Sequence, residues 1–268
     1  MPVTDTETAR TAARVAGEIV RTGFEEAFET SMKGSVDPVT DVDEKAERAI
    51  RDIIAETSPD DLILGEEGGG SRWDSERIWI VDPLDGTVNF VHGVPQFAVS
   101  IALWEDGRPQ LGVVLDVIRS EEFFAGRGQG ATLNGRPISV SKTRDLDNSL
   151  LGTGFPYDRR THGAAYLAVV GDVLARARGM RRLGSAALDM CWVACGRFDG
   201  YWEHGGAHGV KPWDVAAGML IVTEAGGKVT DENGAHNHLD ATAFVATNGL
   251  IHEPLREIVE ARMPDHLR

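Results

Sequence analysis

The chain has 268 residues, of which 42% are hydrophobic and 26% charged, and its formal net charge is −15. This composition is typical of a globular protein that buries a substantial core, as one large domain or two of moderate size. The acidity argues against nucleic acid as a partner, because a basic footprint is missing. It would also repel an anionic substrate, unless metal ions reverse the charge locally.

The first ten residues, "MPVTDTETAR", lack the basic start and apolar core of a signal peptide. No run of apolar residues approaches the length of a membrane span, which predicts no membrane partner. The only cysteines, Cys191 and Cys195, lie four apart in a helical pattern and are expected to be reduced core thiols. The sequence therefore predicts a cytoplasmic protein.

In chain order, apolar spacing predicts a long amphipathic helix over 5–31. Residues 33–43 are expected to form a loop or short hairpin, with Asp43 as the cap of a helix over 44–57. A short strand then begins at Leu62 and runs into carboxylates and a glycine loop. Ile78 to Val81 read as a buried strand.

Strands and turns alternate over 97–142, which predicts an antiparallel sheet. After about residue 145 strands and helices alternate, which is typical of an α/β fold. The expected helices are 162–178, 185–196, 211–227 and 251–262, and the expected strands are 149–155, 197–203 and 243–249. We therefore divide the chain into an α+β half, 1–145, and an α/β half, 146–268, which form one compact catalytic unit.

Acidic residues recur where regular structure begins or ends. They are Asp43, the pair Glu66 and Glu67, the pair Asp82 and Asp85, and Asp214. Each has an ordinary explanation as a turn or capping residue. Ligand sites nevertheless favour the carboxyl ends of strands, and oxygen ligands of this kind suit Mg²⁺. Because Gly86 and Thr87 follow directly and can hold a phosphate, the residues alone indicate metal-assisted phosphoryl chemistry.

The histidines offer a weaker alternative site. His204 and His208 lie in a glycine-rich stretch, and His236 and His238 lie near a turn. Without neighbouring cysteines their spacing is poor support for zinc. We expect them to be solvated loop residues.

Four segments together resemble the inositol monophosphatase family: "GEE" at 65–67, "WIVDPLDGTVNFVHGVPQFAVSIAL" at 79–103, "GSAALDMCWVACGRFDGYWE" at 184–203 and "KPWDVAAGMLIVTEAGG" at 211–227. The similarity spans nearly the whole chain, and D-P-x-D-G-T-x-N combined with G-E-E and W-D-x-A-A-G is highly specific. It implies a layered αβαβα sandwich, two or three Mg²⁺ ions, inhibition by lithium and a homodimer. The implied substrate is a small phosphate monoester, myo-inositol 1-phosphate or a related polyol or sugar phosphate.

The resemblance also implies roles for individual residues. Glu66, Asp82 and the Leu84 carbonyl would hold one Mg²⁺, and Asp82, Asp85 and Asp214 would hold a second. Thr87, oriented by Asp43, would activate the attacking water, with Glu66 also reaching a third ion. The residues implied to contact the substrate are Asp85, Gly86, Thr87, Gly184, Ser185, Ala186, Glu203 and Asp214. Lys33 and Glu67 are implied to support the site.

The substrate stays open at this stage. Histidinol-phosphate, fructose 1,6-bisphosphate and 3′-phosphoadenosine 5′-phosphate phosphatases share the chemistry. An alternative of another class is a regulatory binding protein that retains the fold, for instance a regulator of the transcription machinery. The link 204–211 is about four residues longer than the family pattern and adjoins Glu203, which makes it a candidate flap over the leaving group.

Overall fold

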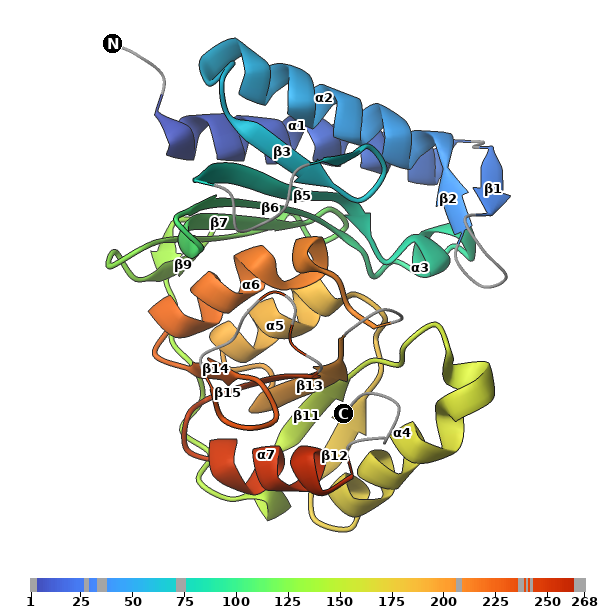
Figure 1. The fold of residues 1–268 in the computed structure, drawn as a ribbon, viewed down its shortest axis with the longest axis vertical. Coiled ribbons are helices and arrows are strands. Elements are labelled where there is room, and N and C mark those ends of the chain that lie inside the picture. The colour runs from blue at the N-terminus through green and yellow to red at the C-terminus, as the bar shows by residue number, and fades with distance from the viewer. Residues whose placement is uncertain are drawn as a thin grey trace.

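The structure is a computed structural model that describes residues 4–26, 29–32, 38–70, 76–205, 209–235, 239, 241 and 243–262. Its elements stack in alternating layers of helices and sheets (Figure 1). From one end of the molecule to the other the layers are α1 with α2, a large sheet, α5 with α6, a smaller sheet, and α4 with α7. The predicted αβαβα sandwich is therefore confirmed.

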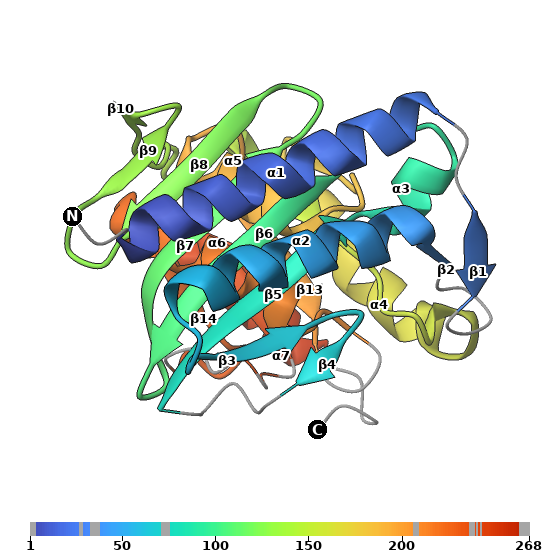
Figure 2. The same ribbon diagram turned by 90° about the horizontal axis from the view of Figure 1, so that it is seen from above.

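The outermost helices of the N-terminal half are α1 (Asp5–Glu25) and α2 (Asp41–Thr57). They lie side by side across one face of the large sheet (Figure 2). The buried face of α1 is rich in alanine, which lets this helix approach α2 and the strands closely. Capping boxes centred on Thr4 and Thr40 set where the helices begin.

Two expectations about this layer are wrong. The first helix ends at Glu25 and does not continue to residue 31, because Thr30–Met32 (β1) pairs instead with Pro38–Thr40 (β2). Asp43 is not the cap of α2. It lies three residues after the cap, Thr40, and its carboxylate accepts a hydrogen bond from the Thr40 backbone N–H.

The large sheet has eight strands in the order β10-β9-β8-β7-β6-β5-β3-β4. Its pairs are antiparallel except β3 with β5, which are parallel and therefore end at the same edge. The strands are β3 (Leu62–Gly65), β4 (Gly69–Gly70), β5 (Arg77–Asp85), β6 (Ala98–Glu105), β7 (Arg108–Asp116), β8 (Glu121–Gly126), β9 (Ala131–Leu133) and β10 (Arg136–Pro137). The predicted antiparallel block is thus confirmed, although its last strand is short.

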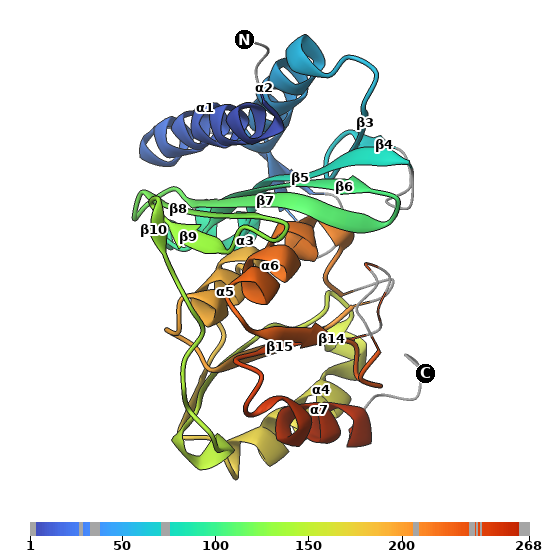
Figure 3. The same ribbon diagram turned by 90° about the vertical axis from the view of Figure 1, so that its left-hand side faces the viewer.

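The central layer consists of α5 (Ala186–Ala194) and α6 (Pro212–Glu224). Every residue of α6 from Val215 to Val222 is buried, because the helix packs against both sheets (Figure 3). A helix that is apolar all round suits a layer without a solvent face. Pro212 in its first turn and Gly226 after its end mark its limits, as predicted.

The smaller sheet has five strands in the order β12-β11-β13-β15-β14. They are β11 (Leu150–Thr153), β12 (Gly179–Arg181), β13 (Gly200–His204), β14 (Lys228–Thr230) and β15 (Ala243–Thr247). The outer face of this sheet carries α4 (Arg159–Leu174) and α7 (His252–Ala261). The predicted helix over 162–178 thus starts and ends earlier, because the chain turns after Leu174 to enter β12.

Short elements complete the described chain: a five-residue helix, α3 (Thr87–Val91), and a 3₁₀ turn, η1 (Leu146–Asn148). Within the described residues, no helix combines the length and apolar character needed to cross a bilayer. The division at residue 145 into two halves stays a prediction as a domain boundary.

Candidate active site

An irregularity at the end of β5 brings two aspartates to one place. Asp82 pairs with Ser100 on β6, whereas Asp85 pairs with Ala98. Three steps along β5 thus match two along β6, which is a bulge with one extra residue. Pro83 lies within it, where its missing N–H breaks no regular ladder. The bulge re-aims the strand, so that Asp82 and Asp85 both supply an oxygen to one cluster.

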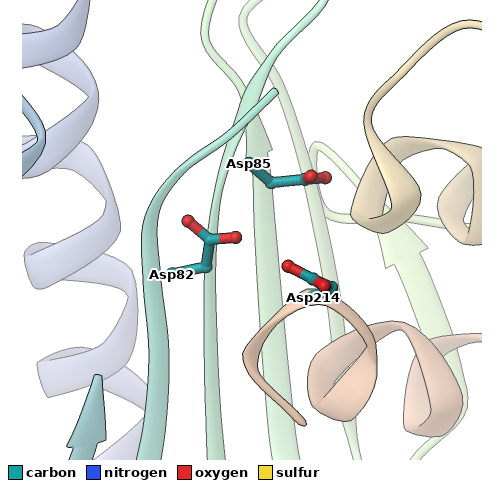
Figure 4. Close-up of side chains that lie close together, drawn as sticks. All are labelled: Asp82, Asp85 and Asp214. Carbon is teal, nitrogen blue, oxygen red and sulfur yellow. The ribbon is translucent and has the colours of Figure 1, made fainter. Parts of the chain in front are cut away.

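Asp214 completes this cluster from the central helical layer, opposite the strand that carries Asp82 and Asp85. It lies in the first turn of α6, where its carboxylate accepts a 2.6 Å hydrogen bond from the Lys211 backbone N–H. Asp82, Asp85 and Asp214 each present one oxygen, and the three oxygens lie within 4.8 Å of one another. Figure 4 shows the three carboxylates converging from the strand and the helix.

The hydrogen bonds of Asp82 fit a bound cation. Its Oδ1 accepts a 2.9 Å hydrogen bond from the Leu84 backbone N–H. Its Oδ2 is buried and has no hydrogen-bond partner among the described residues. A buried oxygen without a donor is costly unless a cation satisfies it. The all-oxygen donor set suits Mg²⁺ or a similar hard ion, so the residues present fit the metal.

The electrostatics of the cluster point the same way. Burial, followed by the charges of Glu66, Asp85 and Asp214, raises the pKa of Asp82 well above its ordinary value. Burial likewise raises the pKa of Asp85 to about 6 and that of Asp214 strongly. Carboxylates this close repel one another, and a divalent cation between them would remove the repulsion.

Thr87 lies beside the cluster at the start of α3. Its hydroxyl is 3.2 Å from Asp43 Oδ1 and 3.1 Å from the Leu84 carbonyl. Asp43 is buried, and burial raises its pKa to about 6, against hydrogen bonds from Thr40 that lower it. Because Thr40 already occupies Asp43 Oδ2, the other oxygen is left for Thr87. The structure thus brings the predicted nucleophile-activating pair into hydrogen-bond distance.

Glu66 reaches the site from the turn after β3. It lines the same pocket as Asp82 and Asp85, and its charge raises the pKa values of Asp43, Asp82 and Asp85. The turn is held by Glu47 of α2, whose carboxylate accepts hydrogen bonds of 2.8 Å from the backbone N–H groups of Glu67 and Gly68. Arg51 pairs with Glu47 at 2.7 Å and donates to the Gly69 carbonyl at 2.9 Å. Sequence reasoning missed Glu47, which lies in an ordinary helical pattern.

Gly86 and the segment 184–186 come together although they lie about a hundred residues apart. A Cβ atom on Gly86 would lie 3.2 Å from the Gly184 carbonyl, and Gly86 has a φ of +103°, so only glycine fits readily. Ser185 donates a 2.6 Å hydrogen bond to Asp85 Oδ2, and the Ala187 N–H donates one of 2.8 Å. The 184–186 segment therefore orients a predicted metal ligand as well as lining the pocket.

Asn89 ties these segments together and was not assigned a role from the sequence. Its side-chain amide donates hydrogen bonds of 2.8 Å to the carbonyls of Gln96 and Leu183. It is the final residue of the D-P-x-D-G-T-x-N pattern, which was the available signal. The amide links the turn after β5 to the segment before α5.

Glu203 lies at the inner end of the same pocket, on β13. It is buried and accepts a 2.6 Å hydrogen bond from the Tyr201 hydroxyl, and burial raises its pKa to about 7. Asp189 on α5 also lines the pocket, and burial followed by the charge of Glu203 strongly raises its pKa. Sequence reasoning missed Asp189, because a lone aspartate inside a helical pattern carries no signal.

The remaining predicted residues fall into three groups. The side chain of Glu67 was expected to support the site, and its backbone N–H donates a 2.8 Å hydrogen bond to Glu47. Lys33, His208, His236 and His238 lie outside the described residues. The expectation of a solvated His204 is wrong, since it is 2% exposed at the end of β13 and its ring packs against Tyr166.

An αβαβα sandwich with a cluster of carboxylates between its large sheet and its central helices is the architecture of a metal-dependent enzyme class, and known proteins share it. The sequence profile of the Inositol monophosphatase family matches residues 2–263. A relative from Pseudomonas aeruginosa, named Nus factor SuhB, is 43% identical over 264 residues, which are 96% of each chain. An inositol-1-monophosphatase of Rhizobium meliloti is 41% identical over 252 residues, 93% of each.

Solved structures agree. The structure of inositol monophosphatase from Anabaena has a TM-score of 0.84 and 39% sequence identity, over 98% of this chain and 97% of that one. The chain therefore belongs to the inositol monophosphatase family, and the resemblance that the sequence motifs indicated is confirmed.

Proposed function

We propose that the protein is a Mg²⁺-dependent phosphomonoesterase that hydrolyses myo-inositol 1-phosphate or a related polyol or sugar phosphate. The observation that carries the proposal is the Asp82, Asp85 and Asp214 cluster, in which one buried Asp82 oxygen has no hydrogen-bond partner among the residues that the structure describes. Membership in the family and the neighbouring Thr87 and Asp43 pair support it. Histidinol-phosphate, fructose 1,6-bisphosphate and 3′-phosphoadenosine 5′-phosphate remain competing substrates.

In this proposal Glu66, Asp82, Asp85 and Asp214 would hold two or three Mg²⁺ ions together with the Leu84 carbonyl. Bound Mg²⁺ would supply Lewis-acid stabilisation of the phosphate and lower the pKa of water at the site. Asp43 holds Thr87 so that its hydroxyl orients the attacking water. The backbone N–H groups of Gly86 and Thr87 hold the phosphate, and Glu203 with the 184–186 segment holds the alcohol.

A panel of phosphate-release assays tests this function. The substrates are inositol 1-phosphate, histidinol phosphate, fructose 1,6-bisphosphate and 3′-phosphoadenosine 5′-phosphate, each with Mg²⁺ and with a chelator. We expect Mg²⁺-dependent release that is fastest with a polyol or sugar phosphate. Equal rates with and without Mg²⁺ would overturn the metal assignment. Lithium is expected to inhibit by competing for the cation site.

A second candidate function is regulatory binding, and one observation favours it: the relative named Nus factor SuhB is 43% identical over nearly the whole chain. Because this chain is acidic, we infer that such a partner would be a protein and not nucleic acid. One variant distinguishes the catalytic function from the binding function. Asp82→Asn would abolish turnover but leave an exposed binding surface unchanged. Cytoplasmic location and a homodimer stay predictions.

A further inference from the structure

Two arginines line the same pocket as the aspartate cluster. Arg159 opens α4, and Arg182 directly follows β12. Among the described residues neither guanidinium has a carboxylate within 4 Å, whereas those of Arg77, Arg197 and Arg256 do. In a chain of net charge −15, a guanidinium that lines a pocket and forms no ion pair with a described carboxylate is available to an anionic ligand.

Neighbouring groups hold both arginines at this pocket. Arg159 donates a 3.2 Å hydrogen bond to the Pro156 carbonyl, and its guanidinium carbon lies 5.8 Å from the centre of the Tyr157 ring. The guanidinium carbon of Arg182 lies 6.0 Å from the centre of the Phe155 ring. Arg182 also folds over Gly184, where a Cβ atom would lie only 2.8 Å from its Nη1. The glycine therefore leaves room for the guanidinium at the pocket.

Close to the arginines the pocket has an acidic inner wall. Arg182 lowers the pKa values of Glu203 and Asp189 against the effect of burial, so its charge lies near both. Asp189 is 1% exposed, and its Oδ1 has no hydrogen-bond partner in the described part of the chain. Buried carboxylate oxygens are normally paired, so an unpaired one that lines a pocket suits a ligand hydroxyl.

We propose that Arg159, Arg182, Asp189 and Glu203 form a leaving-group subsite for a hydroxylated alcohol that carries a second anionic group. The two carboxyl groups would accept hydrogen bonds from ligand hydroxyls, and the two guanidinium groups would bind the second anion. This inference rests on the proposed phosphatase activity and narrows its substrate class: within that class it favours a sugar phosphate with a second anionic group over myo-inositol 1-phosphate, whose alcohol half is uncharged. The preferred substrates are phosphate monoesters whose alcohol half bears a phosphate or a carboxylate.

Two matched pairs of substrates test the subsite. One pair tests a phosphate as the second anionic group, and the other tests a carboxylate. Fructose 1,6-bisphosphate is compared with fructose 1-phosphate, and 3-phosphoglycerate with glycerol 3-phosphate. Wild-type kcat/KM should favour the doubly anionic member of at least one pair. The Arg159→Gln/Arg182→Gln variant should lower that preference by about 10-fold or more, because charge-assisted hydrogen bonds are lost.

Arg181→Gln is the matched control. Arg181 is an exposed neighbour that does not line the pocket and donates to the Met180 carbonyl, so removing its charge should leave the preference unchanged. Asp189→Asn tests the inner wall, and it should lower kcat/KM more for the sugar phosphates than for glycerol 3-phosphate, which has fewer hydroxyls.

The outcomes are distinguishable. Hydrolysis of the single-anion substrates without any preference in wild type would overturn the subsite and leave the phosphatase intact. An equal loss for both members of each pair in the arginine variant would mean that the arginines serve the scissile phosphate, which also overturns it. If no substrate is hydrolysed, the proposed function fails. Calorimetric binding of fructose 1,6-bisphosphate and fructose 1-phosphate to wild type and the arginine variant then decides the subsite alone, and equal affinities would reject it.

Discussion

At the scale of single residues, the two oxygens of Asp82 differ in their surroundings. One accepts a hydrogen bond from the backbone, and the other is buried without a donor among the described residues. A residue in this position binds a cation well for the same reason that it destabilises the metal-free protein. Function and stability therefore oppose each other at Asp82.

Asp82→Asn should lower turnover to a small fraction of wild type and raise the melting temperature of the metal-free protein. The amide removes one negative charge from the cluster and offers a donor to its neighbours. Thermal unfolding in a chelator and phosphate release with Mg²⁺ check the two effects. Asp116→Asn is the control, because Asp116 is buried but paired with Arg119 at 2.8 Å, so its loss should lower the melting temperature. Full activity of Asp82→Asn in saturating Mg²⁺ would contradict the metal assignment.

Thr87→Ala should lower kcat by at least about 100-fold with little change in KM, because the hydroxyl that Asp43 orients is lost. Thr87→Ser keeps the hydroxyl and should retain most of the activity. Steady-state kinetics of both variants decide the matter. A large rise in KM at unchanged kcat would show instead that Thr87 only binds the substrate.

At the scale of elements, the active site depends on how helices and strands end. α2 contributes Asp43 from its first turn and Glu47 one turn later, and Glu47 holds the turn that follows β3. Gly65 and Gly68 pack so tightly on Glu47 that a Cβ atom on either would overlap its carboxylate. This contact explains the glycines on both sides of "EE" as packing requirements.

Glu47→Gln should raise the Mg²⁺ concentration needed for half-maximal activity by roughly 10-fold or more, since groups that orient metal ligands have effects of this size. The reason is that the turn carrying Glu66 loses its charged acceptor. Mg²⁺ titrations of activity measure the change. Glu44→Gln, on the exposed face of the same helix, removes the same charge and should behave as wild type. Equal Mg²⁺ requirements for all three proteins would rule out this role.

Much of the element order could be predicted from the sequence, because hydrophobic periodicity and the residues that end helices and strands are signals carried by short stretches of sequence. Pro212 and Gly226 mark α6, and the apolar run before Asp82 marks β5. Asp82, Asp85 and Asp214 could be singled out because acidic residues at such ends break the local pattern. Asp189 and Arg182 could not, since their importance comes from a pocket that segments far apart in sequence build together. The β1 strand was missed because its pairing with β2 overrides helical spacing.

At the scale of the whole molecule, buried acids make stability depend on pH. Burial raises the pKa values of Asp43 and Asp85 to about 6 and that of Glu203 to about 7, from ordinary values of 3.8 and 4.5. Between these limits the folded protein binds more protons than the unfolded chain. Its free energy of unfolding therefore falls as pH rises through this window.

The melting temperature of the metal-free protein should accordingly fall by roughly 5 °C or more between about pH 5 and about pH 7.5. Mg²⁺ should reverse much of this loss, and its stabilising effect should grow with pH, because it binds the deprotonated cluster. Calorimetry across this range with and without Mg²⁺ measures both effects. A metal-free protein that becomes more stable with rising pH would contradict the assignment of these buried acids.

The fully buried α6 has a consequence for synthesis on the ribosome. The large sheet is complete once residue 137 has emerged, but the helix that covers its inner face begins only at Pro212. During that interval the sheet presents apolar side chains such as Ile80 and Val114, which α5 and α6 later cover. The nascent chain is therefore expected to need protection from aggregation over about 75 residues of elongation. Asp214 then arrives together with that cover, so the cation site and the closed core form in the same event.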